Sequence, residues 1–164
     1  SFAPLLRSWA GSPLAALQTA YVETFDLSRK HALYLSYWTD GDTRRRGEAL
    51  ATFKARYRAS GCVVRLHGEL PDFLPLVLEY AAVADPVDGA ALLQEYRPSL
   101  ELLRLALLEA GSPYAGVLEA ICATLPGASP ADRREVLARA QAGPPTEAVG
   151  LDPYDPRLLP LAEG

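Results

Sequence analysis

The sequence predicts an all-α fold, and three observations point to it. Apolar residues recur at helical spacing in almost every segment, and most segments begin at Ser-Pro, Pro or Asp positions that favour helix starts. No alternation of strands with helices is present. At 164 residues, with 49% hydrophobic and 22% charged residues, the chain suits a single domain with its own core. We expect an all-helical domain over residues 1–142 and an extended Pro/Gly-rich arm over 143–164.

The first half of the chain predicts three helices followed by a loop. Hydroxyl and carboxylate side chains favour helix N-termini because they accept hydrogen bonds from free backbone N–H groups. Leu14, Leu17 and Phe25 share one face of the first helix, and Phe53 and Tyr57 share one face of the third. The predicted boundaries are a first start at Ser12-Pro13, a second helix from Ser28 to about Trp38, a third from Asp42 to about Gly61, and an extended loop over Cys62–Leu66.

The second half predicts five more helices. Leucines surround almost the whole of the segment 100–108, and Glu101 and Arg104 form only a narrow polar stripe. A helix that is apolar nearly all round is typical of the buried centre of a bundle. The predicted starts are Pro71-Asp72, Val87, Pro98, Ser112-Pro113 and Ser129-Pro130, and the inward residues expected in the last helix are Val136, Leu137 and Ala140.

The overall charge narrows the classes of partner. The formal net charge is -4 and the isoelectric point is ≈ 5.2. Nucleic acids and anionic membranes attract basic proteins, so this composition argues against either as the main partner. The run Arg44–Arg46 leaves room for a local basic patch within an acidic chain.

Nothing in the sequence suggests export or a membrane span. No apolar run reaches the roughly 18 residues that a span needs, and Ser1–Leu6 lacks the basic and apolar regions of a signal peptide. Cys62 and Cys122 form neither a disulfide framework nor a zinc spacing, so we expect reduced thiols and a cytoplasmic location. The chain contains no methionine, so we expect further sequence before Ser1.

No motif for bond-making chemistry is recognisable. The sequence lacks a phosphate-binding loop, a dinucleotide fingerprint and a Gly-x-Ser-x-Gly motif, and His31 and His67 lie outside metal-ligand spacings. One alternative stays open, a nucleophile pair made of Cys62 and His67 on the same loop. Cys122, on an apolar helix face, is expected to be inert core. The sequence therefore predicts a protein that is not an enzyme.

Aromatic, acidic and basic residues concentrate in the segments 21–26, 34–37 and 41–47. The aromatic residues there either fill the core or line a groove. Asp72 either caps a helix or lies at the rim of that groove. Glu23 either pairs with an arginine or lies at the same rim. Cations at a helix N-terminus are unfavourable, so we expect an acidic residue near Arg44–Arg46. An apolar groove with charges at its rim is suited to an incoming amphipathic segment.

These motifs carry a resemblance to a known family. Tyr-Val-Glu-Thr-Phe-Asp (21–26), Leu-Tyr-Leu-Ser-Tyr (33–37), Gly-Asp-Thr-Arg-Arg-Arg-Gly (41–47), Glu-Leu-Pro-Asp-Phe-Leu-Pro (69–75), Leu-Glu-Tyr (78–80) and Gly-Ser-Pro-Tyr-Ala-Gly-Val-Leu-Glu (111–119) stand in this order. Together they resemble the nitrate reductase molybdenum cofactor assembly chaperones. These form the delta-subunit family, a branch of the TorD-like redox-enzyme maturation proteins. The resemblance covers roughly residues 12–125.

The resemblance implies a TorD-like helical bundle without catalysis. It implies a chaperone of respiratory nitrate reductase that binds the apo catalytic (α) subunit, including its N-terminal peptide. The chaperone holds that subunit until molybdenum-bis(molybdopterin guanine dinucleotide) is inserted, before membrane attachment, and keeps no cofactor itself. Contact with cofactor-biosynthesis proteins stays open, as does the choice between monomer and homodimer.

Two departures from the family pattern are visible. Phe73 stands where the family commonly has histidine, and the family's N-terminal helix is expected to be truncated. The residues that we predict to contact the peptide are Tyr21, Glu23, Phe25, Asp26, Tyr34, Tyr37, Arg44, Arg46, Glu69, Pro71, Asp72 and Glu79. The alternative function is a small all-α dimerising scaffold or regulatory module with no peptide-binding role.

Overall fold

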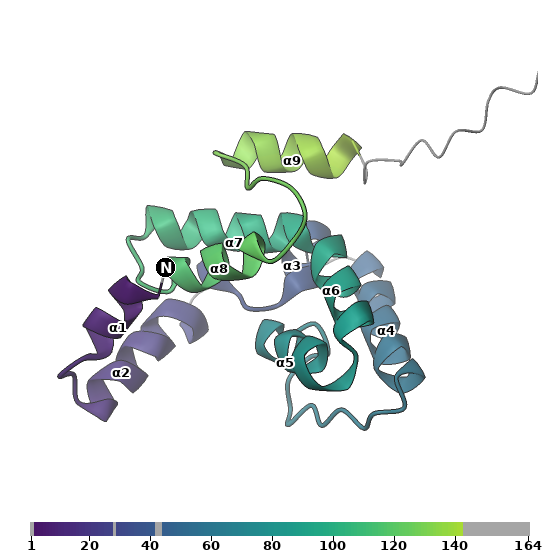
Figure 1. Ribbon diagram of the computed structural model, residues 1–164, viewed down its shortest axis with the longest axis horizontal. Coiled ribbons are helices and arrows are strands. Elements are labelled where there is room, and N and C mark those ends of the chain that lie inside the picture. The colour runs from purple at the N-terminus through teal and green to yellow at the C-terminus, as the bar shows by residue number, and fades with distance from the viewer. Residues whose placement is uncertain (1, 28, 42–43, 143–164) are drawn as a thin grey trace, which may run out of the picture.

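Helices arranged around one long central helix make up the computed structural model, which describes residues 2–27, 29–41 and 44–142 (Figure 1). Within these residues no strand forms, and Tyr34 and Phe73 make an isolated antiparallel bridge. The predicted all-α, single-domain bundle is confirmed. The α-helices are α1 (Ala3–Trp9), α2 (Leu14–Tyr21), α3 (Leu35–Asp40), α4 (Arg44–Ala59), α5 (Leu74–Glu79), α6 (Pro86–Glu95), α7 (Arg97–Glu109), α8 (Ala115–Ala123) and α9 (Arg133–Ala142). Two π-helical turns, η1 (Val22–Asp26) and η3 (Tyr80–Ala84), and a 3-10 turn, η2 (Arg29–His31), complete the described elements.

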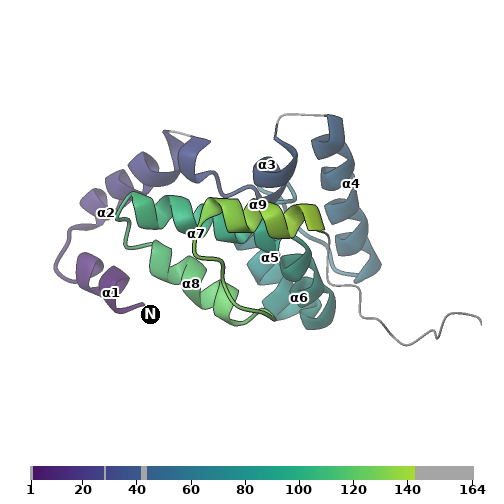
Figure 2. The same ribbon diagram turned by 90° about the horizontal axis from the view of Figure 1, so that it is seen from above.

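Helix α7 is the centre of the bundle. It packs against α3, α6, α8 and α9, while α1 and α2 lie at one end and α4, α5 and α6 at the other (Figures 1 and 2). Leu100, Leu103 and Leu107 are almost completely buried. The central buried helix predicted from the leucine pattern is therefore confirmed. The core around it also includes Phe53, Tyr57, Val77, Leu92 and Leu118.

The polar stripe of α7 is buried and holds the linker to α9. Arg104 Nε donates a 2.6 Å hydrogen bond to Glu101, which is 1% exposed, and Arg104 Nη2 donates at 2.7 Å to the Pro130 carbonyl. Arg97 donates to the carbonyls of Pro126 and Gly127. Because each buried charge has a partner, the stripe fastens the loop over 126–130 to the central helix.

The N-terminal region differs from the prediction. Helix α1 forms before the first predicted helix, and no helix was predicted there. Ser12 does not cap α2, because its hydroxyl donates a 2.8 Å hydrogen bond to the Ser8 carbonyl, and Pro13 occupies the N-cap position. The helix predicted over 28–38 is wrong in its first half. Only η2 and α3 are helical there, because the Leu33 carbonyl accepts a hydrogen bond from Leu74 N–H instead.

Some of the predicted boundaries of the later helices are confirmed and others are wrong. Helix α6 begins at Pro86, within one residue of the predicted start at Val87, and Asp85, for which no cap was predicted, accepts from the N–H groups of Val87 and Asp88. Gly61 has the positive φ (73°) expected of a helix stop. Helix α5 begins at Leu74 rather than at Pro71-Asp72. The last helix begins at Arg133 and not at Ser129-Pro130, because the Asp132 carboxylate accepts from Glu135 N–H. In it Val136 is buried as predicted, whereas Leu137 and Ala140 are exposed.

Some predictions fall outside the described residues. The caps expected of Ser28 and Asp42 and the arm over 143–164 are among them. Among the helices that the structure describes, none combines the length and the apolar character needed to cross a bilayer.

We predict that Gly89→Ala destabilises the fold. Gly89 lies where α6 crosses η3, and an added Cβ would collide with the backbone of Ala81. Backbone atoms cannot move aside as a side chain can, so the free energy of unfolding in urea should fall by about 1–3 kcal/mol. The matched control is Gly47→Ala in α4, where an added Cβ meets nothing within 4 Å. That change should be neutral or stabilise by about 0.5–1 kcal/mol. Equal stability of the two variants would contradict the crossing geometry.

Candidate functional site

Residues 33–36 and 71–74 are joined by a set of hydrogen bonds that we call the clasp. Leu35 N–H donates to the Asp72 carbonyl at 3.0 Å, and Leu74 N–H donates to the Leu33 carbonyl at 2.8 Å. Tyr57 of α4 adds a 2.6 Å hydrogen bond from its hydroxyl to the Pro71 carbonyl. The clasp therefore connects the start of α3, the start of α5 and the C-terminal part of α4.

Asp72 is the buried centre of the clasp. Its Oδ2 accepts from Ser36 N–H at 3.0 Å and from the Ser36 hydroxyl at 2.6 Å, so it caps α3 from a distant part of the chain. Asp72 is 0% exposed. Asp72 is therefore a helix cap, as one of the two sequence interpretations has it, but it caps α3 and not the helix that follows it in the chain. Its burial does not fit a position at a groove rim.

A tyrosine–carboxylate–arginine group lies beside the clasp. The Tyr34 hydroxyl donates a 2.6 Å hydrogen bond to Glu69, and the Arg46 guanidinium carbon lies 5.9 Å from the Tyr34 ring centroid and 5.8 Å from that of Tyr37. The hydrogen bond to Glu69 raises the pKa of Tyr34 to about 12, with burial adding to the effect. Phe73 packs against Tyr34 with 5.6 Å between ring centroids. Glu69 and Arg46 thus contact the same tyrosine, the carboxylate at the Tyr34 hydroxyl and the guanidinium over its ring.

The Tyr21–Asp26 motif forms the end of α2 and the π-helical turn η1. Leu27 N–H donates to the Val22 carbonyl at 3.0 Å, five residues back, which widens the turn. Phe25 points into the core, whereas Glu23 and Asp26 are exposed. π-Helical turns are rare and occur frequently at functional sites.

Four aromatic rings meet at this turn. Tyr114, just before α8, lies 4.9 Å from Phe25, 6.3 Å from Tyr21 and 6.4 Å from Trp9 of α1, measured between ring centroids. We call these four residues the aromatic cluster. Burial raises the pKa of Tyr21, with contributions from Asp26, Tyr114 and Glu69. Glu69 therefore lies within electrostatic range of both the clasp and the aromatic cluster.

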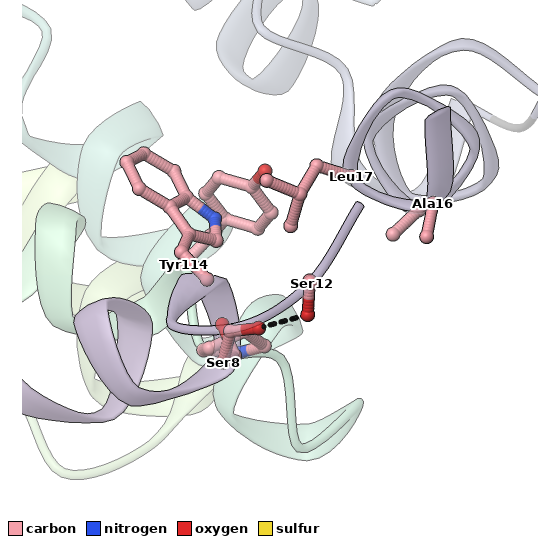
Figure 3. Close-up of a pocket in the computed structure, with 8 residues that line it drawn as sticks. Ser8, Ser12, Ala16, Leu17 and Tyr114 are labelled. Carbon is pink, nitrogen blue, oxygen red and sulfur yellow. Dashed lines mark hydrogen bonds between the residues drawn. The ribbon is translucent and has the colours of Figure 1, made fainter. Parts of the chain in front are cut away.

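A hollow of about 170 Å³ opens beside the aromatic cluster, between α1, α2 and the start of α8. Leu17 of α2 points toward the Tyr114 ring across it, and the Ser12 hydroxyl is engaged with the backbone of Ser8 at its edge (Figure 3). Because most of its wall is hydrocarbon, the hollow is suited to an apolar group. It is lined by Ser8, Trp9, Ser12, Ala16, Leu17, Ala20, Pro113 and Tyr114.

The surface around the hollow is unusually apolar. Helix α2 contains no buried residue, although it is mostly hydrophobic. Leu14 and Leu27 are each 71% exposed and Leu6 is 59% exposed. Exposed apolar surface that continues over several elements is typical of a protein-binding site. The further exposed members are Phe2, Trp9, Tyr21 and Val22.

The acidic residues next to this surface are not neutralised. Glu23 and Asp26 form no ion pair with any residue that the structure describes, so the arginine pairing considered for Glu23 is not formed. Their exposed carboxylates lie on the turn that carries Phe25 and follows α2, a helix that lines the hollow.

The predicted site residues thus divide into two groups and a remainder. Tyr21, Glu23, Phe25 and Asp26 belong to the aromatic cluster and its turn, and Tyr34, Tyr37, Arg46, Glu69, Pro71 and Asp72 belong to the clasp and its neighbours. Arg44 and Glu79 are exposed and join neither group. Pro71 and Asp72 are buried, so neither side chain is exposed to a guest in this structure.

Three residues of this region were not predicted from the sequence. Trp9 and Leu17 line the hollow, and Tyr114 joins the aromatic rings. The only sequence signal for Tyr114 was the motif over 111–119. The only sequence signal for Trp9 was its aromatic side chain, and the only signal for Leu17 was its helical spacing from other apolar residues.

The structure gives no support to chemistry at the cysteines. Cys62 is exposed, and no hydrogen bond joins it to His67 among the described residues. Cys122 is buried, and burial raises its pKa to about 12, which confirms it as inert core. Within residues 2–27, 29–41 and 44–142 no group of three or more histidine, cysteine or acidic residues could hold a metal ion.

Comparison with known proteins places these features in context. Residues 1–120 match a family model that is described as "Nitrate reductase delta subunit". The nitrate reductase-like protein NarX of Mycobacterium tuberculosis is 50% identical over 112 residues, 68% of this chain and 17% of that protein.

Two relatives have names that state a role. The probable nitrate reductase molybdenum cofactor assembly chaperone NarJ of Bacillus subtilis is 36% identical over 110 residues, 67% of this chain and 59% of that protein. The nitrate reductase molybdenum cofactor assembly chaperone NarJ of Escherichia coli is 38% identical over 103 residues, 63% of this chain and 43% of that protein. The chain therefore spans well under two thirds of the length of each of these relatives.

We predict that Asp72→Ala lowers stability more than any exposed acid does. The change leaves the Ser36 N–H and hydroxyl buried without an acceptor, which should cost about 1–3 kcal/mol in urea unfolding. Asp26→Ala is the matched control and should change stability by less than about 0.5 kcal/mol, because Asp26 is exposed. If the two variants unfolded at the same urea concentration, Asp72 would not be the centre of the clasp.

We also predict that Tyr34 contributes to an alkaline transition, together with Tyr57, Tyr80 and Tyr96, whose pKa values burial also raises. The Tyr34 pKa of about 12 exceeds the ordinary value of 10.0, so the folded state holds this proton more tightly than the unfolded state does. The resulting stabilisation is complete below pH 10 and is lost as the pH rises from 10 to 12. In ¹³C NMR titration of tyrosine, Glu69→Gln should move the pKa of Tyr34 toward 10, whereas Glu79→Gln should leave it unchanged. A Tyr34 pKa unaffected by Glu69→Gln would refute the assignment.

Proposed function

The chain belongs to the nitrate reductase delta subunit family, and from this premise we propose that it is a chaperone dedicated to respiratory nitrate reductase. It binds the apo catalytic (α) subunit, including its N-terminal peptide, in the cytoplasm. It keeps that subunit competent for insertion of molybdenum-bis(molybdopterin guanine dinucleotide) before membrane attachment. The names of the NarJ relatives support this role.

The single observation that carries the peptide-binding part is the apolar hollow beside the aromatic cluster. A cavity of about 150 Å³ accommodates a benzene-sized group, so a hollow of about 170 Å³ is suited to one large apolar side chain of a guest. The exposed face of α2 continues the apolar surface along one helix direction. A guest helix with apolar residues at positions i, i+3 and i+4 would cover this face.

The charges beside the hollow define the guest further. Glu23 and Asp26 present exposed carboxylates on the turn that follows α2, so the guest that fits best is basic as well as amphipathic. Arginine can contact a carboxylate with two parallel hydrogen bonds, which fixes orientation in addition to strengthening binding. Glu69, within range of Tyr21, extends the acidic field toward the clasp.

The cofactor belongs to the partner in this proposal. The described residues offer no metal-binding cluster, and the chain's own contribution is to hold a polypeptide. It performs no bond-making step. The clasp contributes rigidity, because it fixes the orientation of Tyr34 and Glu69 relative to α4.

A second function, self-association as a dimerising scaffold, is favoured by the same exposed apolar surface on α1 and α2. Light scattering over a concentration series separates the two functions. A mass that doubles with concentration, and does not return to that of a monomer when peptide is added, would favour the scaffold.

The test is titration of the protein with a synthetic peptide of the first residues of the nitrate reductase α subunit from the same organism. We expect saturable binding, followed by calorimetry and by the fluorescence of Trp9, which lines the hollow. Ala16→Trp should fill the hollow and abolish or strongly weaken binding, because Ala16 lies in its wall. Ala90→Trp, at an exposed position of α6, is the matched control and should bind as the wild type does.

The same titration tests the acidic rim. The double variant Glu23→Gln with Asp26→Asn should weaken binding about 2- to 30-fold, from about 0.2–1 kcal/mol for each exposed pair, without lowering the melting temperature. Glu48→Gln with Glu109→Gln removes the same charge from exposed positions elsewhere and should leave binding nearly unchanged. Absence of binding to the wild type, or equal weakening by both pairs, would overturn the proposal.

A further inference from the structure

The charge of this acidic chain is strongly uneven. Residues 44–68 contain seven lysines and arginines and one acidic residue, Glu48, and therefore carry a formal charge of +6. The chain as a whole carries -4, so the remainder carries -10. The positive segment consists of α4 and the loop that follows it.

The free cations of this segment lie on the outer face of α4. Phe53 and Tyr57 mark the inner face and are buried. Arg44, Lys54 and Arg58 are exposed and occupy a narrow arc on the opposite side, because fourteen residues correspond to almost four helical turns. The stripe is about 21 Å long at 1.5 Å per residue. Arg65 and Val63, which is 91% exposed, continue it along the loop.

None of these cations is paired within the described part of the chain. Arg56 bonds to Glu95 and lies near Asp88, and Arg46 lies over two tyrosine rings, so both are engaged on the inner side. Arg44, Arg45, Lys54, Arg58 and Arg65 make no ion pair with described residues. Small exposed residues between them, Gly47, Ala51 and Ala55, allow another chain to approach the helix closely.

The sequence after α9 has the opposite charge. Residues 143–164 contain four acidic residues and one arginine, which gives a formal charge of -3. In their middle, Tyr154 stands between Asp152 and Asp155, an arrangement that can offer an aromatic face and two carboxylates to arginine or lysine side chains. Five prolines favour an extended backbone, which loses little entropy on docking.

The position of α9 brings these two features together. In both views the C-terminal end of α9 lies toward the end of the molecule that carries α4 (Figures 1 and 2). Twenty-two residues can extend to about 70 Å, well beyond the length of the basic stripe. Because the arm is tethered to the same molecule, its effective concentration at α4 is of millimolar order.

We propose that the acidic C-terminal arm, residues 143–164, docks along the basic outer face of α4. The contact neutralises cations that no described residue neutralises, and it covers the basic outer face of α4. It is electrostatic and exposed, so it weakens as salt is added and yields to an acidic partner that competes for α4. The inference does not depend on the proposed function.

A spin label on Cys62 tests the proposal in the full chain. Cys62 is exposed and follows the end of α4 by three residues, whereas Cys122 is buried with a raised pKa and does not react. We expect the amide NMR signals of residues 150–160 to lose intensity relative to the diamagnetic form at low salt. The loss should disappear in 0.5 M salt, a concentration at which the screening length is only a few ångström, about 3–5 Å.

Variants and dilution complete the test. Lys54→Glu with Arg58→Glu should abolish the intensity loss, whereas Arg133→Glu with Arg134→Glu, the same charge change at exposed positions of α9, should retain it. Circular dichroism confirms that each variant is folded. The proposal is overturned if the wild type shows no loss of signal intensity or if the α4 variant keeps that loss. It is also overturned if the intensity loss appears only between labelled and unlabelled molecules, because the arm would then dock on a second copy.

Discussion

The buried carboxylate of Asp72 is the interaction on which the rest of the site depends. It caps α3 through Ser36, thirty-six residues away, and its backbone pairs with Leu35. This places Tyr34 against Glu69 and brings the tyrosines of α3 under Arg46 of α4. A helix as short as α3, six residues, is not stable by itself, so a cap supplied by tertiary structure is what makes it form at this place.

The acidic residues of this protein have separate physical roles. Asp72 and Glu101 are buried. Asp72 holds the start of α3 directly, whereas Glu101 bonds to Arg104, which in turn holds the distant Pro130 carbonyl. Glu23 and Asp26 stay in water with no partner, so they remain available to a cationic guest. Glu69 stands between these classes, half-buried and bonded to Tyr34, yet within range of Tyr21. Burial alone separates residues that look equivalent in the sequence.

The two ends of the bundle also differ in the chemistry of their surfaces. The α1–α2 end exposes hydrocarbon with carboxylates beside it, and the α4 end exposes cations on a regular helix. The central helix α7 lies between the two ends and packs against α3, α6, α8 and α9 through its buried leucines. A chaperone with this arrangement could offer an apolar, acidic surface and a basic surface without either neutralising the other.

The sequence alone determined the fold class, the buried leucine helix, the start of α6 near Val87 and the end of α4 near Gly61, because these depend on local periodicity and local hydrogen bonds. It also placed Tyr34, Arg46 and Glu69 among the candidates. Only the tertiary structure decided that Asp72 caps α3, that residues 32–34 are extended, and that Trp9, Leu17 and Tyr114 surround a hollow. Those outcomes rest on contacts between residues 36 to about 100 positions apart, and local pattern contains no information on which distant group will supply a hydrogen bond or cover an apolar face.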